Sequence, residues 1–199
     1  TETAPFSAFL TPEFAVSKLG SAGQPPIFSD TRIVDSDNKP LPAGEKGEIC
    51  LRGPNIMKGY WNRPDATAAA IDSEGWFHSG DIGYLDEDGF LFICDRLKDM
   101  VISGGENVYP AEVEGVLYKH EAIAEVAVIG MPDEKWGEAV TAVVALNEGQ
   151  SLTLEQLREF AAEHLAKYKL PLRLEIVDAL PRNPAGKVLK FVLKEQLNG

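Results

Sequence analysis

The chain has 199 residues, 44% of them hydrophobic, and its 31 acidic side chains outnumber its 19 basic ones, giving a net charge of −12. This is enough apolar material for one large or two small domains. The acidic balance argues against nucleic-acid binding, because phosphate backbones attract clustered positive charge. No run of apolar residues is long enough to predict a membrane-spanning helix.

The first half of the sequence is typical of short β-strands. Residues 30–35 (DTRIVD) and 48–53 (EICLRG) alternate apolar with polar side chains, and a turn-rich stretch separates them. Residues 83–95 predict a hairpin, because an Asp-Glu-Asp-Gly turn divides two apolar runs. Residues 65–71 predict one short helix with Asp65 as its N-cap. We therefore expect a small β-barrel-like subdomain.

From about residue 97, strands alternate with helices. A first helix is expected to begin at Pro110, and the cap of a second is either Ser151 or Thr153. The predicted elements are helix 110–120, strands 125–130 and 139–146, helix 153–168, strand 172–178 and helix 186–197. The fold class is therefore mixed: the barrel-like part is followed by an α+β domain of about three strands and three helices.

We place a domain boundary within the charged stretch DRLK. This gives a first domain over residues 1–95 and a second over residues 96–199. No linker rich in Gly, Pro or Ser separates the two, so the sequence predicts a tight hinge.

The two cysteines, Cys50 and Cys94, each lie in an apolar, strand-like run. They could pair, but lone buried thiols in a reducing, cytoplasmic compartment fit this placement better. His78, His120 and His164 share no spacing typical of a metal site. We therefore predict no metal cluster from these residues.

Asp81 lies between Gly80 and Gly83 at the entry to the predicted hairpin. A carboxylate on such a turn can accept hydrogen bonds from both hydroxyls of a ribose, or it can stabilise its own turn. The spacing alone favours the second interpretation.

Two further features, a glycine pair and a lysine, have a structural and a functional interpretation. Gly104 and Gly105 follow a strand-like run and could either open the backbone to a ligand or form a simple turn before the helix at Pro110. Lys187 follows a Pro/Asn/Gly turn, with no catalytic partner nearby in the sequence. It could be a solvated side chain in the first turn of the last helix, or a mobile charge that enters a site elsewhere. By sequence alone the structural interpretation is favoured for both features.

Five segments, taken together, resemble one family. These are GEICLRGPNIMKGYW, GWFHSGDIG, DRLKDMVISGGENVYPAEVE, DEKWGEAV and PRNPAGKVLK. In this order and at these separations they are similar to the adenylate-forming acyl-CoA synthetases, and most of all to bacterial fatty-acyl-CoA and 4-coumarate-CoA ligases. The resemblance runs from Thr1 to about Leu197. It implies the last third of such an enzyme, a fragment that lacks the large N-terminal region with its phosphate-binding loop and acyl pocket.

The resemblance also implies roles in the first half-reaction, in which a carboxylate and ATP form acyl-AMP and pyrophosphate. By this similarity Asp81 holds the ribose hydroxyls of ATP, and Arg96 adds a ribose or phosphate contact. Thr1 lies at the phosphates and Glu2 at Mg²⁺. Lys187 is the catalytic lysine that bridges the carboxylate and the α-phosphate.

In the second half-reaction, the thiol of coenzyme A displaces AMP. The resemblance implies that the C-terminal domain first rotates about Lys98. Gly104, Gly105 and Glu106 would then line a narrow tunnel for the pantetheine arm, with Trp136 along its wall.

The predicted function is thus the C-terminal portion of an AMP-forming acid–thiol ligase that uses ATP, Mg²⁺ and coenzyme A. Its expected partners are a small carboxylic acid and the missing N-terminal domain, and a homodimer is possible because such families often dimerise. One alternative is an adenylation domain that loads a carrier protein, and another is a non-catalytic binding remnant. A remnant would be expected to lack Lys187, Asp81 or Arg96, yet all three residues are present.

Overall fold

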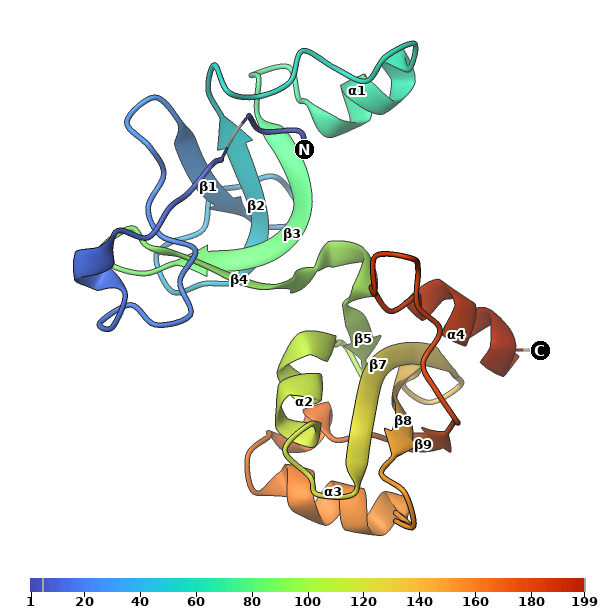
Figure 1. Ribbon diagram of the computed structural model, residues 1–199. Coiled ribbons are helices and arrows are strands. Elements are labelled where there is room, and N and C mark those ends of the chain that lie inside the picture. Colours follow the sequence, from blue (N-terminus) through green and yellow to red (C-terminus); the bar gives the residue numbers. More distant parts are fainter. Residues whose placement is uncertain (5, 199) are drawn as a thin grey trace. The chain divides into compact units, whose positions relative to one another are not determined.

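The computed structural model describes residues 1–4 and 6–198, which divide into two compact units. Unit 1 comprises Thr1–Leu97 and unit 2 comprises Lys98–Gly199 (Figure 1). Within the described residues, no helix has both the length and the apolar character needed to cross a membrane.

Unit 1 is built on an antiparallel sheet of four strands with the order β1-β2-β3-β4. Its elements are η1 (Pro12–Phe14), β1 (Asp30–Val34), β2 (Gly47–Arg52), α1 (Pro64–Ala70), β3 (Phe77–Leu85) and β4 (Leu91–Arg96). The sheet is an open meander in the described residues and does not close into a barrel, so the prediction of a barrel-like subdomain is not confirmed. Instead, Ala22 and Gly23 exchange backbone hydrogen bonds with Leu91 at the start of β4.

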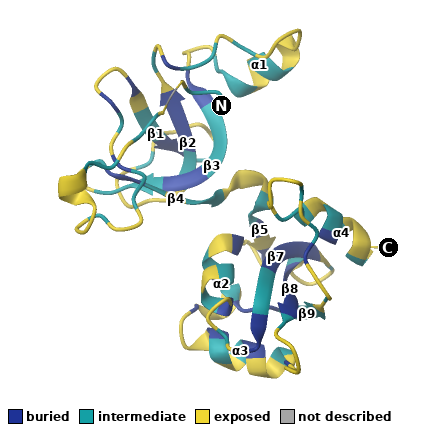
Figure 2. Ribbon diagram, in the orientation of Figure 1, coloured by how far each residue is buried: buried dark blue, intermediate teal, exposed yellow. Residues whose placement is uncertain are grey.

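Side-chain alternation gives the unit 1 sheet two different faces. Ile49 and Leu51 join an apolar cluster with Phe77, whereas Cys50, which lies between them on β2, packs with Trp76 on the other face. Such alternation follows from the two-residue period of a strand. In unit 1, most of the buried residues belong to the strands of this sheet (Figure 2).

Two local predictions in unit 1 had different outcomes. The predicted hairpin is confirmed as β3 and β4, with Leu85 paired to Leu91 and the Asp86 carboxylate accepting the amides of Asp88 and Phe90. The short helix is also present, but Asp65 is not its cap. Arg63 holds the N-cap position without a side-chain cap, because Pro64 begins the helix.

Unit 2 contains a second sheet and three α-helices. Its elements are η2 (Leu97–Asp99, which begins one residue before the unit), β5 (Val101–Ser103), β6 (Glu106–Val108), α2 (Pro110–Leu117), β7 (Ile123–Asp133), β8 (Gly137–Leu146), α3 (Leu154–Ala162), η3 (Lys167–Lys169), β9 (Arg173–Ile176) and α4 (Lys190–Asn198).

The long hairpin β7–β8 is the centre of unit 2. The sheet has the order β6-β5-β8-β7, and β9 pairs with β8 in parallel. Helices α2 and α3 contribute buried residues to one face, including Leu117 and Leu157, while Leu193 of α4 packs on the other. Because both faces are covered, β7 and β8 are apolar along most of their length, as the sequence predicted.

The structure corrects three predictions for unit 2. Its sheet has five strands, not about three, because β5 and β6 are only three residues long and give little periodic signal. Helix α3 ends at Ala162, well before residue 168. Helix α4 begins at Lys190, so residues 186–189 form a turn and a β-bridge before the helix.

Candidate functional site

Asp81 and Arg96 are register partners on β3 and β4. Arg96 Nε lies 2.8 Å from Asp81 Oδ1, in an ion pair that is partly exposed to solvent. The guanidinium of Arg96 holds one side of the Asp81 carboxylate and so fixes its orientation. The carboxylate stays accessible, so a ligand can reach it in this orientation. The structure therefore brings together the two residues predicted to contact the ribose.

The backbone beside Asp81 departs from regular strand pairing. The register of β2 with β3 shifts between Glu48 and Cys50, and Gly80 has φ +69° within this irregularity. The Gly80 amide donates to Glu48 Oε1 (3.1 Å), and the Asp81 amide donates to Ser79 Oγ (3.1 Å). A bulge of this kind re-aims the side chains next to it. Glu48 and Ser79 therefore help to position Asp81, a role that sequence reasoning did not assign to Glu48.

Glu2 lies in a different part of unit 1. Its carbonyl accepts the amide of Met57, and its carboxylate accepts the hydroxyl of Tyr60 (3.2 Å). The pKa of Glu2 lies below its ordinary value, chiefly because its own backbone N–H donates to the carboxylate and also because of the Tyr60 hydroxyl. Thr1 is exposed and precedes Glu2 in the chain. Glu2 thus offers an ionised, accessible oxygen ligand.

In unit 2, the glycine pair forms the turn of the β5–β6 hairpin and contacts Trp136. Gly104 and Gly105 have φ +62° and +85°, a region that favours glycine. The Gly104 amide donates to the Trp136 carbonyl (2.8 Å), and a β-carbon at Gly104 would lie 2.8 Å from Cε3 of the indole. Glycine at 104 is therefore needed both for the turn and for this close approach.

Trp136 also borders a cavity of about 320 Å³. Trp136 is 40% exposed, so one part of the residue packs on the hairpin while another faces solvent. The other lining residues are Ser103, Arg158, Lys167, Tyr168, Leu170 and Leu172. Glu106 is exposed on β6, where it pairs with Ser103. The predicted tunnel residues therefore cluster around one hairpin.

Lys187 is exposed on a turn that ends before α4. Asn183 Oδ1 accepts the amides of Ala185 and Lys187, and the Asn183 amide donates to the Lys187 carbonyl. Gly186 has φ +82°, which completes the turn. The backbone of Lys187 is therefore held firmly, although its side chain projects into solvent from a loop and not from a helix.

Lys187 and Lys98, the predicted hinge residue, line the same cavity of about 340 Å³ in unit 2. Lys190 and Lys194 contribute further positive charge, and Asp99 contributes a carboxylate. Lys190 Nζ is paired with Glu114 (2.7 Å), whereas Lys187 Nζ has no ion pair among the described residues. Lys187 is thus freer than Lys190 to reach a separate ligand.

Two family models match the chain. The model described as AMP-binding enzyme matches residues 1–61, and the model described as AMP-binding enzyme C-terminal domain matches residues 112–187. The first match contains Thr1 and Glu2, and the second contains Trp136 and Lys187.

Relatives and solved structures extend this similarity along the whole chain. The chain is 53% identical over 195 residues to the 2-succinylbenzoate–CoA ligase of Geobacillus sp. strain WCH70, covering 98% of the chain and 39% of that protein. It is 48% identical over 190 residues to the feruloyl-CoA synthase of Amycolatopsis sp., covering 96% of the chain and 38% of that protein.

The o-succinylbenzoate CoA synthetase of Bacillus subtilis has a similar structure. In complex with its acyl-adenylate intermediate it matches with a TM-score of 0.87 and 43% identity, over 100% of the chain and 39% of that protein. In complex with ATP and magnesium ion it matches with a TM-score of 0.85 and 42% identity, over 100% of the chain and 40% of that protein. The chain thus spans about two fifths of the length of these relatives.

Proposed function

Because this chain belongs to the family of AMP-binding, adenylate-forming enzymes, we propose that it is the C-terminal portion of an AMP-forming acyl-CoA ligase. In this proposal residues 1–95 are the end of the large adenylation domain, and residues 96–199 are a mobile C-terminal domain. The observation that carries the proposal is the 53% identity to a CoA ligase over 98% of the chain.

In the first half-reaction, a carboxylate oxygen attacks the α-phosphorus of ATP, and pyrophosphate leaves. Asp81, held by Arg96, accepts hydrogen bonds from the ribose hydroxyls. Lys187 places its ammonium group between the carboxylate and the α-phosphate, where negative charge accumulates in the transition state. Its exposure and its lack of an ion pair among the described residues support this role, because a lysine held by a fixed partner could not move into another domain's site.

Glu2 fits the magnesium that accompanies ATP. Mg²⁺ prefers oxygen ligands and is commonly bound through one or two carboxylates together with substrate phosphates. The lowered pKa of Glu2 keeps its carboxylate ionised, and the Tyr60 hydroxyl orients it. Thr1, which lies next to it, is the residue that we assign to the phosphates.

In the second half-reaction, the sulfur of coenzyme A attacks the acyl carbonyl carbon, and AMP leaves. We assign Lys98 as the hinge about which the C-terminal domain turns between the two steps. Gly104, Gly105 and Glu106 then border the path of the pantetheine arm, and Trp136 forms its wall. Gly104 has no side chain, and the Trp136 indole packs against its backbone. This leaves a smooth, narrow surface, which supports the assignment.

The names of the relatives suggest which acids to test first. They point to 2-succinylbenzoate and ferulate, both aromatic carboxylates, with fatty acids as a further class. Because the reaction consumes ATP and coenzyme A, we place the enzyme in the cytoplasm. A homodimer of the whole enzyme stays a prediction, which light scattering would test.

The proposal is tested by ATP–pyrophosphate exchange with the full-length gene product and a panel of these acids. We expect acid-dependent exchange, followed by acyl-CoA formation when coenzyme A is added. The 199-residue chain alone should show no exchange, since in this proposal the phosphate-binding loop and the acyl pocket belong to the rest of the enzyme. Full-length protein that transfers the acyl group only to a carrier protein would contradict the CoA ligase assignment.

A further inference from the structure

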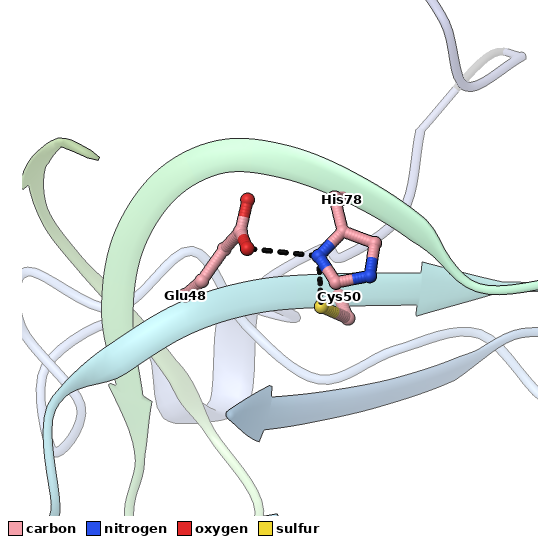
Figure 3. Close-up of side chains that lie close together, drawn as sticks. All are labelled: Glu48, Cys50 and His78. Carbon is pink, nitrogen blue, oxygen red and sulfur yellow. Dashed lines mark hydrogen bonds and ion pairs between the residues drawn. The ribbon is translucent and has the colours of Figure 1, made fainter. Parts of the chain in front are cut away.

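The pairing of β2 with β3 brings Glu48, Cys50 and His78 together (Figure 3). Cys50 and His78 are register partners, and the bulge between Glu48 and Cys50 lets the Glu48 carboxylate reach the same imidazole. His78 Nδ1 lies 2.8 Å from Glu48 Oε2 and 3.4 Å from Cys50 Sγ. One ligand atom from each residue lies within 4.8 Å of the other two.

Carboxylates lie near both ring nitrogens of His78. Glu48 Oε2 is 2.8 Å from Nδ1, and Asp72 Oδ2 is 3.7 Å from Nε2. Ionised carboxylate oxygens only accept hydrogen bonds, so a bare Nδ1 lone pair facing Glu48 would be repelled. Either a hydrogen carried on Nδ1 or a metal ion must therefore lie between them.

The donor set favours a borderline metal such as Zn²⁺. Thiolate, imidazole and carboxylate are its usual ligands, at about 2.3, 2.0–2.1 and 2.0–2.2 Å. A tetrahedral arrangement with these bond lengths separates the ligand atoms by about 3.3–3.6 Å. The Nδ1–Sγ distance already lies in this range, and the Nδ1–Oε2 distance needs to open by only about half an ångström. Three protein ligands would leave a fourth position for water.

Asp72 lies beside the ring nitrogen of His78 that faces away from Glu48 and Cys50. A metal-bound histidine usually gives its other N–H to a carboxylate or a carbonyl, which fixes the tautomer. Asp72 is placed for this role beside Nε2, and its other contacts hold it there, since Asp72 accepts the amides of Glu74 and Trp76. The nearby positive charge of Arg32 is offset by Asp72 (3.3 Å) and Glu74 (3.8 Å).

From this geometry we propose that Glu48, Cys50 and His78 form a binding site for a Zn²⁺-class metal ion, with Asp72 orienting the histidine. Glu48 and His78 are about one fifth exposed, which gives solvent a route to the open position. The thiol of Cys50 is neutral at pH 7, because burial, aided by the charge of Glu48, raises its pKa to about 11. Metal binding would release this proton to solvent, together with any proton on Nδ1.

Such a site would stabilise the part of the sheet that positions Asp81. Glu48 uses Oε1 to accept the Gly80 amide, so ligation through Oε2 leaves that hydrogen bond in place. A metal ion would join β2 to β3 at the bulge, and we expect it to raise the melting temperature of the chain. The proposal does not depend on the catalytic assignment above.

Titration of the full 199-residue chain with Co²⁺ under reducing conditions tests the proposal. We expect one Co²⁺ per chain, a thiolate-to-cobalt charge-transfer band, and the intense visible bands of a four-coordinate ion, all reversed by Zn²⁺. Cys50→Ser should abolish the charge-transfer band, and Asp72→Asn should weaken affinity by about 10- to 100-fold. Cys94→Ser is the matched control and should keep the full spectrum.

A measurement on the unaltered protein covers the case in which a variant fails to fold. Nitrogen-15 NMR of the histidine rings should show that Zn²⁺ shifts the signals of His78 and leaves those of His120 and His164 unchanged. The proposal is overturned if the wild-type chain gives no charge-transfer band, or if a folded Cys50→Ser variant keeps it. It also fails if Zn²⁺ shifts another histidine instead of His78.

Discussion

Asp81 and Arg96 face each other across the β3–β4 ladder, with Arg96 Nε 2.8 Å from Asp81 Oδ1. The two residues are fifteen positions apart in the sequence, and the hairpin turn at Asp86 brings them together. Since the pair is partly exposed, its contribution to folding is small, about 0–1 kcal/mol. Its tight geometry is better explained by the orientation that it gives to the carboxylate.

The first prediction concerns this carboxylate. In the full-length enzyme, Asp81→Asn should weaken AMP binding by about 10- to 100-fold, because a charged acceptor of ribose hydrogen bonds is lost. Isothermal titration calorimetry with AMP measures the effect. Asp30→Asn is a matched control, because Asp30 forms a similar exposed cross-strand pair with Arg52 (3.1 Å). Equal loss in both variants would contradict a nucleotide-binding role for Asp81.

The second prediction separates two adjacent glycines. Both have positive φ, so alanine strains the backbone at either position by about 1 kcal/mol. Only at Gly104 would the new β-carbon also meet the Trp136 ring, whereas nothing lies within 4 Å at Gly105. Gly104→Ala should therefore destabilise unit 2 more than Gly105→Ala. In the full-length enzyme it should slow thioester formation and spare pyrophosphate exchange. Thermal unfolding and the two half-reaction assays check this, and indistinguishable variants would refute it.

The third prediction concerns the start of α3. Thr153 Oγ1 accepts the amide of Gln156, and the Gln156 side chain accepts the amide of Thr153, which forms a capping box. Thr153→Ala should cost about 0.5–2 kcal/mol of unfolding free energy. Ser151 was the other candidate for the cap, so Ser151→Ala is the control and should change stability little. Urea denaturation of both variants measures the difference, and a larger effect at Ser151 would contradict the assignment.

The fourth prediction concerns pH. The pKa of Asp133 is lowered, first by the hydrogen bond from the Trp136 amide, and then by those from the Lys135 amide and the Arg173 side chain. A carboxyl group with a lowered folded pKa stabilises the fold fully above its unfolded pKa of about 3.9, and this contribution disappears as the pH falls through the folded value.

Asp133→Asn should therefore lower the melting temperature at pH 7 but cause a smaller decrease near pH 3. Thermal unfolding followed by circular dichroism at the two pH values gives the comparison. Glu134→Gln, one residue along the same turn, is the control, because the amides of Lys135 and Trp136 donate to Asp133 and not to Glu134. A pH-independent deficit in Asp133→Asn would mean that the side chain acts through packing and not through its charge.

The sequence predicted the elements of unit 2 wherever a segment was long and strongly apolar. Strands β7 and β8 are buried on both faces, so their composition alone marked them. Strands β5 and β6 were not predicted, because three residues carry too little periodicity and the intervening glycines look like a simple turn. The sequence also could not predict that the unit 1 sheet stays open, because closure into a barrel depends on which strands pair with one another.

The candidate site residues also differ in how far their arrangement could be predicted from the sequence. The turn that carries Lys187 is local, because Asn183 binds backbone groups within four residues, yet the sequence pattern extended the last helix over it. The Glu48–Cys50–His78 cluster depends on strand register across 28 residues between the cysteine and the histidine. A search for metal-ligand spacing along the chain cannot find such a site, because the sheet and not the spacing brings the ligands together.

The last prediction concerns Lys187 and separates the two half-reactions. In the full-length enzyme, Lys187→Ala should reduce ATP–pyrophosphate exchange by about 10²–10³-fold, the usual effect of losing one electrostatic contact to a transition state. Conversion of supplied acyl-AMP to acyl-CoA should be nearly unchanged, because the lysine is expected to leave the site before that step. Lys194→Ala is the control, since Lys194 lines the same cavity as Lys187 and has no assigned catalytic role. Equal slowing of both half-reactions by Lys187→Ala would show that the residue supports the domain's structure and is not a mobile catalytic charge.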